Sequence, residues 1–193
     1  MLVSSNLFKK SSKSRKVRCE ICANYCKIAD GSYGICKQHK NINGELFDES
    51  FGVVSSLNAD PIEKKPLYHF LPGTLTYSVG GFGCNMGCLH CQNYMISQEF
   101  DKISDRFNIL PETIVENAIN QGCKSIAWTY NEPTIHLPFN KKTSLLAKRK
   151  NLKIVYVSNG YMSDQSLSEI LNFVDAFNID SVSYTHLTLP TIA

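Results

Sequence analysis

Three cysteines, Cys84, Cys88 and Cys91, constrain this chain more than any other feature, because their C-x3-C-x2-C spacing brings three thiols close together. They lie in a glycine-rich stretch, residues 80–93, which we call the cysteine loop and which follows the β-type run Leu75 to Val79. Three such thiolates can hold three corners of a cubane [4Fe–4S] cluster. The loop lacks the fourth cysteine and the proline of a ferredoxin run, so one iron would stay open to a cofactor or substrate. A zinc loop or three unrelated thiols is the alternative.

A second set of thiols, the N-terminal cysteine group, lies within residues 19–36. Its members are Cys19, Cys22, Cys26 and Cys36. Four soft ligands suit a structural Zn²⁺ site or an accessory iron–sulfur cluster, and the spacing does not decide between them. His39 could replace one of the thiols. Because so small a segment buries little apolar surface, we expect its metal to supply much of its folding free energy.

The use of cysteine indicates a reducing compartment. Seven of the eight cysteines fall into the two groups, a pattern typical of metal ligation rather than disulfides. The N-terminus has no apolar signal segment, and no run is long enough to cross a bilayer. We therefore expect a cytoplasmic protein without a membrane partner. A net charge of +3 is too weak to predict binding to nucleic acid.

The chain divides into four expected regions. Residues 1–18 carry a basic run without an acidic residue, which we interpret as a disordered leader; an arm for nucleic acid or an acidic partner is the alternative. Residues 19–73 form the cysteine-rich metal-binding segment and then an extended wrap, because three prolines disfavour a regular helix. Residues 74–181 form the main domain, and residues 182–193 form a tail.

The main domain alternates strands and helices. The expected strands are Thr74 to Gly80, Ser125 to Thr129, Lys153 to Ser158 and a fourth that begins at Ala176. Pro111 marks a helix start, Ser163 caps another helix, and Pro138 is expected to delay the helix between them. This alternation predicts an α/β fold with a parallel sheet, whose chemistry lies at the carboxyl ends of the strands.

The cysteine loop at the end of the first strand resembles the defining motif of the radical S-adenosylmethionine (SAM) superfamily. In that family SAM chelates the fourth iron. The resemblance therefore implies a [4Fe–4S] cluster on Cys84, Cys88 and Cys91, SAM as cofactor, and a partial (β/α) barrel, here truncated and preceded by the cysteine-rich segment. The N-terminal cysteine group has the x2 and x3 spacings in reverse order, so we predict no second SAM site there.

The resemblance also implies contacts to SAM from the strand ends. Glu132 and Asn131 occupy the place of the family's Gly-Gly-Glu motif, although the double glycine is absent, and Glu132 is the candidate acceptor for the SAM ammonium. Ser158 and Asn159 would contact the methionyl carboxylate or the ribose, and His90 fills a family position near the adenine. Strand-end packing or turn chemistry is the alternative for each. No residue facing the substrate is predicted.

Several segments together resemble one subfamily, the radical SAM member of the AmmeMemoRadiSam system, which is related to pyruvate formate-lyase activating enzymes. They are the N-terminal cysteine group and residues 60–67, 83–85, 91–93 and 129–134. The resemblance implies reductive cleavage of SAM to methionine and a 5′-deoxyadenosyl radical that abstracts hydrogen from a substrate. It also implies an electron donor such as flavodoxin or ferredoxin, and companion proteins of the same system. A glycyl-radical-enzyme activase and a zinc-ribbon binding module are the alternatives.

The end of the chain breaks the strand–helix pattern. Val182 to Thr191 resembles the in-frame translation of a transposase sequencing adapter, so we expect natural sequence to stop near Asp180. A genuine polar strand is the alternative. A barrel cut at its fourth strand would leave an open apolar edge, and we expect the polypeptide as written to aggregate and to be inactive. Soluble expression with SAM cleavage would contradict this expectation.

Overall fold

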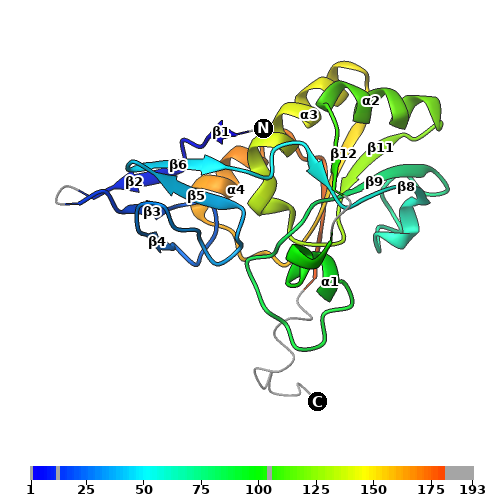
Figure 1. Ribbon diagram of the computed structural model, residues 1–193. Coiled ribbons are helices and arrows are strands. Elements are labelled where there is room, and N and C mark those ends of the chain that lie inside the picture. The colour runs from blue at the N-terminus through cyan, green and yellow to red at the C-terminus, as the bar shows by residue number, and fades with distance from the viewer. Residues whose placement is uncertain (1, 12–13, 104–105, 181–193) are drawn as a thin grey trace, which may run out of the picture.

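A five-stranded sheet forms the centre of the α/β part of the chain (Figure 1). The computed structural model describes residues 2–11, 14–103 and 106–180. The sheet has the order β13-β12-β11-β9-β8. Its members are β8 (Ser56–Pro61), β9 (Leu75–Gly80), β11 (Ser125–Trp128), β12 (Lys153–Ser158) and β13 (Ala176–Ile179). The last four are parallel, whereas β8 runs antiparallel to β9, so the expected α/β class and parallel ladder are present.

Helices connect the parallel strands. They are α2 (Pro111–Asn120), α3 (Leu137–Arg149) and α4 (Asp164–Ile170). Pro111 lies in the first turn of α2, where its missing N–H costs nothing, and the Ser163 hydroxyl accepts a hydrogen bond from the Ser166 N–H at 3.1 Å to cap α4. Pro138 does not delay its helix as expected, because it lies in the first turn of α3.

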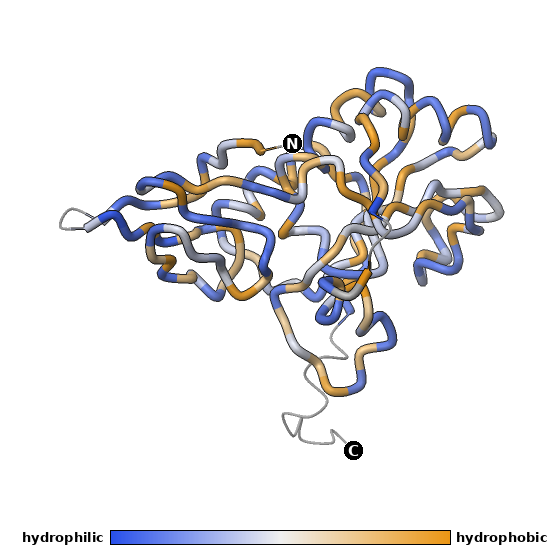
Figure 2. The backbone as a smooth tube through the Cα atoms, in the orientation of Figure 1, coloured by the Kyte–Doolittle hydropathy of each residue, from blue (hydrophilic) through white to orange (hydrophobic). Residues whose placement is uncertain are grey.

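Both faces of the sheet are covered. Ile126 and Ile154 join the core beneath the helices, while Ala127 and Val155 point to the opposite face, where the short 3₁₀ turn η1 (Ile62–Lys64) packs. Burial on both faces is typical of parallel strands and explains why these strands read as continuous apolar runs. Hydrophobic stretches accordingly run through the centre of the molecule in Figure 2.

Small antiparallel sheets form the N-terminal part. Their strands are β1 (Val3–Ser4), β2 (Phe8–Lys10), β3 (Val17–Cys19), β4 (Lys27–Ile28), β5 (His39–Ile42) and β6 (Glu45–Asp48). They pair in the orders β2-β3-β4 and β1-β6-β5. Their own apolar core is small and comprises Val17, Cys19, Ile21, Ile28 and Leu46.

The expectation of a disordered leader over residues 1–18 is wrong for its described part. Strands β1, β2 and much of β3 lie there. Val17 is buried, and the ammonium of Lys9 and the guanidinium of Arg18 lie 3.0 and 3.6 Å from the Glu20 carboxylate. The basic run is ordered because strand pairing buries one of its faces. Glu20, just beyond the run, also pairs with Lys9 and Arg18.

The expected boundary at residue 73 is also wrong. Strand β8 lies within the predicted wrap yet pairs along its length with β9 in the central sheet. Pro61 ends this edge strand, a position where a missing N–H is tolerated. Strand β7 (Val53–Val54) similarly pairs with β10 (Phe107–Asn108), which follows the cysteine loop. Residues 45–61 therefore belong to both parts of the fold.

The central sheet is open, with β8 and β13 at its edges among the described residues. The remaining short elements are α1 (Tyr94–Ser97), η2 (Phe100–Lys102) and η3 (Pro133–His136). Within the described ranges, no helix is both long and apolar enough to span a bilayer. The tail expected at residues 182–193 lies outside those ranges.

Replacing Ile154 by alanine tests the central core. Ile154 is 0% exposed between the sheet and the helices, so Ile154→Ala should lower the free energy of unfolding by about 2–5 kcal/mol. Leu171, which is 60% exposed, provides the control, and Leu171→Ala should change that free energy by less than about 0.5 kcal/mol. Urea denaturation measures both. Equal losses would contradict the placement of the core.

Candidate functional site

An open cavity of about 930 Å³ lies at the carboxyl ends of the parallel strands. Strand β9 leads into the cysteine loop, and β11 and β12 end beside it. Every residue that the sequence assigned to the cluster or to SAM lines this cavity. They are Cys84, Cys88, His90, Cys91, Asn131, Glu132, Ser158 and Asn159. The fold thus brings together residues that are up to 75 positions apart in the chain (159 minus 84).

The three loop thiols share this cavity with a buried carboxylate. Burial, the largest cause, and negative charge at Glu132, Cys88 and Cys91 together raise the pKa of Cys84 to about 12. Several potential anions therefore meet where a cation would relieve their repulsion. In the described residues, no three His, Cys, Asp or Glu side chains stand in a ready-made metal-binding arrangement. The chemistry of the donors fits a cationic iron–sulfur group, and metal binding stays a prediction.

Glu132 is held by a dense set of donors at the end of β11. Its Oε1 accepts hydrogen bonds from the Thr134 N–H and hydroxyl and from the Ser158 hydroxyl, at 3.0, 2.5 and 2.9 Å. Its Oε2 accepts one from the Asn159 N–H at 2.8 Å. Burial raises the pKa of this carboxyl, whereas these donors act to lower it. The remaining acceptor capacity of Glu132 therefore lies on Oε2.

The side chains of Asn131 and Asn159 form hydrogen bonds with backbone groups and with a neighbouring side-chain amide. Asn131 accepts from the Gly81 N–H at 3.2 Å and donates to the Gly83 carbonyl at 2.7 Å, so it clamps the start of the cysteine loop. Asn159 donates to the Asn85 Oδ1 at 2.8 Å. Both residues line the cavity, and their hydrogen bonds give them a positioning role, while the SAM contacts expected from the sequence stay a prediction.

Asn85, which sequence reasoning assigned no role, is the centre of the loop's anchoring. It is 3% exposed, and its Nδ2 donates to the Tyr161 carbonyl at 3.0 Å while its own carbonyl accepts from Asn24 at 2.7 Å. A polar residue directly after a ligand cysteine is the signal that could have identified it. Asn85 ties the loop to the residues after β12 and to the N-terminal part.

A buried chain of polar groups supports the loop from below. The Ser50 hydroxyl donates to Asp48 at 2.5 Å and lies 2.9 Å from His136 Nδ1, so Nδ1 carries the proton. His136 Nε2 then faces the Asn131 amide at 3.4 Å. Gly81 must be a glycine here, because a Cβ would meet His136 Nε2 at 2.3 Å. Burial lowers the pKa of His136 to about 4, so this histidine is neutral at pH 7.

A second wall of the cavity comes from the edge strand and was not predicted. Asp60 on β8 accepts from the Lys65 ammonium at 3.1 Å, from Ser78 at 2.8 Å and from the Tyr130 hydroxyl at 3.2 Å. Burial alone would raise the pKa of Asp60, but hydrogen bonds led by that of Lys64 lower it well below its usual range. Sequence reasoning missed this wall because it interpreted residues 58–73 as a wrap.

Tyr130 contacts both the cysteine loop and strand β8, and its backbone conformation is unusual. Its φ of +75° lies in the left-handed region that non-glycine residues rarely adopt. The Asn93 amide donates to the Tyr130 carbonyl at 2.5 Å, and Asn58 donates to its hydroxyl at 3.1 Å. The far end of the cysteine loop therefore fixes the backbone immediately before Asn131 and Glu132.

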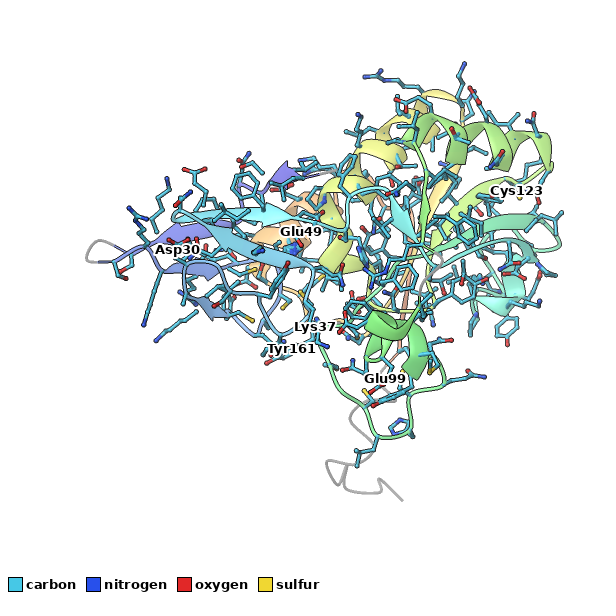
Figure 3. The ribbon with its side chains drawn as sticks, viewed as in Figure 1. Asp30, Lys37, Glu49, Glu99, Cys123 and Tyr161 are labelled. Carbon is cyan, nitrogen blue, oxygen red and sulfur yellow. The ribbon has the colours of Figure 1, made fainter. Side chains whose placement is uncertain are left out.

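The N-terminal cysteine group lines a separate small cavity together with His39. Burial, the largest cause, and the charges of the neighbouring thiols raise the pKa of Cys19 and of Cys36, the latter to about 12. The structure therefore gathers the four thiols and the histidine that the sequence grouped. In the view of Figure 3, Lys37, which follows Cys36, lies near the middle of the molecule, and Cys123 lies at the upper right.

Comparisons with known proteins give a family and one relative. A family model described as the Radical SAM superfamily matches residues 78–189. An uncharacterized protein of Methanocaldococcus jannaschii is 45% identical over 175 residues, a match that covers 90% of this chain and 52% of the relative. The chain thus spans about half the length of the curated relative that it matches.

The buried His136 should make stability depend on pH. Its pKa is lowered to about 4 in the folded protein against 6.5 when unfolded, so the unfolded chain binds more protons between these values. Stability is therefore full above pH 6.5 and falls towards pH 4, by about 3 kcal/mol from this group. Denaturation across this range should show a flatter profile for His136→Gln. His69→Gln, at an exposed position, should keep the wild-type slope, and equal slopes in all three proteins would contradict the assignment.

Proposed function

The chain belongs to the radical SAM superfamily, and on this basis we propose that it binds a [4Fe–4S] cluster through Cys84, Cys88 and Cys91 and SAM in the adjoining cavity. One observation carries the proposal: the three thiols and the buried Glu132 line the same cavity at the carboxyl ends of the parallel strands. When bound, the cluster supplies the electron that splits SAM into methionine and a 5′-deoxyadenosyl radical, which abstracts hydrogen from the substrate.

Glu132 is the residue that we assign to the amino group of SAM. Three donors already occupy its Oε1, and among the described residues the Asn159 N–H is the single donor to its Oε2. An ammonium group placed at Oε2 would form a charge-assisted hydrogen bond within a buried environment. A cation there would also lower the raised pKa of the carboxyl and keep it ionised.

The surrounding residues position the cysteine loop. Asn131 and Asn85 hold the backbone on both sides of Cys84, so the thiol does not have to be ordered when the cluster binds. On the β8 side of the cavity Asp60 pairs with both Lys64 and Lys65, so this side is polar and its three charged groups sum to one positive charge. The hydrogen-donating substrate would enter between these walls.

Within the superfamily, we propose membership of the AmmeMemoRadiSam subfamily, with a partial (β/α) barrel in the complete protein. Its resemblance extends to residues 60–67, which include Asp60 and Lys65 of the second wall. A flavodoxin or ferredoxin would serve as electron donor, and the companion proteins of that system would be partners. A glycyl-radical-enzyme activase is the second candidate, although activases commonly carry their extra cysteines after the SAM motif and this chain carries them before it.

Removing one loop thiol should abolish cluster binding. After anaerobic reconstitution with iron and sulfide, the wild-type chain should hold about four irons at this site, and Cys88→Ala should lose them. Cys123→Ala is the matched control, because Cys123 is a buried core cysteine outside both groups and should leave the iron content unchanged. Formation of 5′-deoxyadenosine is measured in parallel with the longer archaeal relative. Full iron content in Cys88→Ala would contradict the proposal.

Substituting Glu132 should separate SAM binding from cluster binding. Glu132→Gln removes the charge while Oε1 can keep its donors, so SAM affinity should fall about tenfold or more, as expected for a lost hydrogen bond to a charged group. The iron content should stay that of the wild type. Isothermal titration and the change in the cluster's electron paramagnetic resonance signal on adding SAM measure the two effects. Glu116→Gln on the exposed face of α2 is the control, and unchanged affinity in Glu132→Gln would exclude the assigned role.

A further inference from the structure

We propose that Cys19, Cys22, Cys26 and Cys36 bind a single zinc ion, and that this zinc site holds the cysteine loop in position. The first half concerns the N-terminal part alone. The second half rests on the proposed function, because it assigns the loop to the [4Fe–4S] cluster. Different contacts support the zinc site and its effect on the cysteine loop.

The N-terminal site combines four thiols with an unpartnered buried histidine. All four cysteines and His39 line one cavity of about 10 Å³. His39 is 1% exposed, and neither of its ring nitrogens has a hydrogen-bond partner among the residues that the structure describes. A buried imidazole without a partner is costly, so this nitrogen pair indicates a missing group beside the thiols. Within the described ranges, no three His, Cys, Asp or Glu side chains stand in a ready-made metal-binding arrangement.

The size and lining of this cavity favour one ion over a cluster. A space of about 10 Å³ accommodates a single small ion rather than a four-iron cube. The rest of the lining includes the buried side chains of Ile21 and Ile135. Four thiolates in a closed site are the usual ligands of structural zinc. His39 can then donate a ring N–H to a ligand sulfur, which gives one buried nitrogen the partner that it lacks.

Residues beside these cysteines contact the cysteine loop on both sides of Cys84. Before Cys84, Gly83 packs so tightly that a Cβ would meet the Cys36 carbonyl oxygen at 2.6 Å. After it, the Asn85 carbonyl accepts from the Asn24 amide at 2.7 Å, and Asn24 lies between Cys22 and Cys26. The backbone that presents the first cluster ligand is therefore supported by the backbone of the proposed zinc site.

The N-terminal part depends on the zinc for its order. Its own core contains only five buried residues, one of which is Cys19. In so small a unit, metal binding supplies a large share of the folding free energy. Loss of zinc should therefore loosen the segments that carry Asn24 and Cys36. Gly83 and Asn85 would lose their support, and the loop would bind its cluster less well.

Zinc binding is tested first in a chain that cannot hold the [4Fe–4S] cluster. The variant with Cys84, Cys88 and Cys91 all changed to alanine, purified and analysed for metals, should contain about one zinc and no iron. Adding Cys36→Ser should remove the zinc, whereas adding Cys123→Ser should not. Cobalt exchanged for zinc should show the absorption bands of tetrahedral thiolate ligation. Absence of zinc from the triple variant, or an iron–sulfur chromophore there, would overturn the site even if the proposed function holds.

The coupling is tested in the chain with all loop cysteines present. Cys36→Ser should reduce the iron retained after reconstitution several-fold and expose the cysteine loop to limited proteolysis. Asn24→Ala keeps all four zinc ligands and guards against misfolding: it should retain its zinc but also lose iron and protection, because its side-chain contact to the Asn85 carbonyl is removed. Normal iron retention and protection in Asn24→Ala and in the zinc-free Cys36→Ser protein would overturn the coupling. Failure of the wild type to bind iron would instead refute the proposed function.

Discussion

The backbone on either side of Cys84 is fixed by amide hydrogen bonds, and the arrangement of the whole site depends on this constraint. Asn131 clamps Gly81 and Gly83, and Asn85 binds the Tyr161 carbonyl. These contacts connect the cysteine loop to the ends of β11 and β12, the strands that also carry Glu132 and Ser158. Because each amide both donates and accepts, one side chain sets the distance between two segments of the chain. The thiol and the carboxylate are therefore positioned by the same set of bonds.

Electrostatics determine which ligands this site favours. Glu132 is buried, and both it and the other loop thiols raise the pKa of Cys84. A site that concentrates potential negative charge away from water binds cations, and the superfamily's cluster and the sulfonium cofactor are both cationic partners of this kind. The neutral His136 beneath the loop adds no positive charge that would oppose them. On the β8 side of the cavity Asp60 pairs with both Lys64 and Lys65, so the concentration of potential anions lies at the loop and Glu132.

Local sequence patterns predicted the parallel strands and the cap of helix α4. Elements whose position depends on pairing between distant segments were not predicted. Strand β12 and the Ser163 cap agree with the structure because apolar runs and capping hydroxyls act over a few residues. Strand β8 was missed because its stability comes from pairing with β9, and the leader was misjudged because its neutralising Glu20 lies outside it. The cavity residues were identified from motifs. Their division into ligands and positioning groups was not, because it depends on hydrogen bonds such as those of Asn131 between distant segments.

The left-handed backbone of Tyr130 has a consequence for how the cavity keeps its shape. A bulky residue with φ of +75° lies about 1 kcal/mol or more above its preferred conformation. The Asn93 amide on its carbonyl and Asp60 on its hydroxyl hold it there. The strained backbone at Tyr130, just before Glu132, is thus held by a hydrogen bond from Asn93 in the second half of the cysteine loop. If the second half of the cysteine loop loses its order, the backbone before Glu132 should lose its order too. The two segments are coupled through the hydrogen bond between Asn93 and Tyr130.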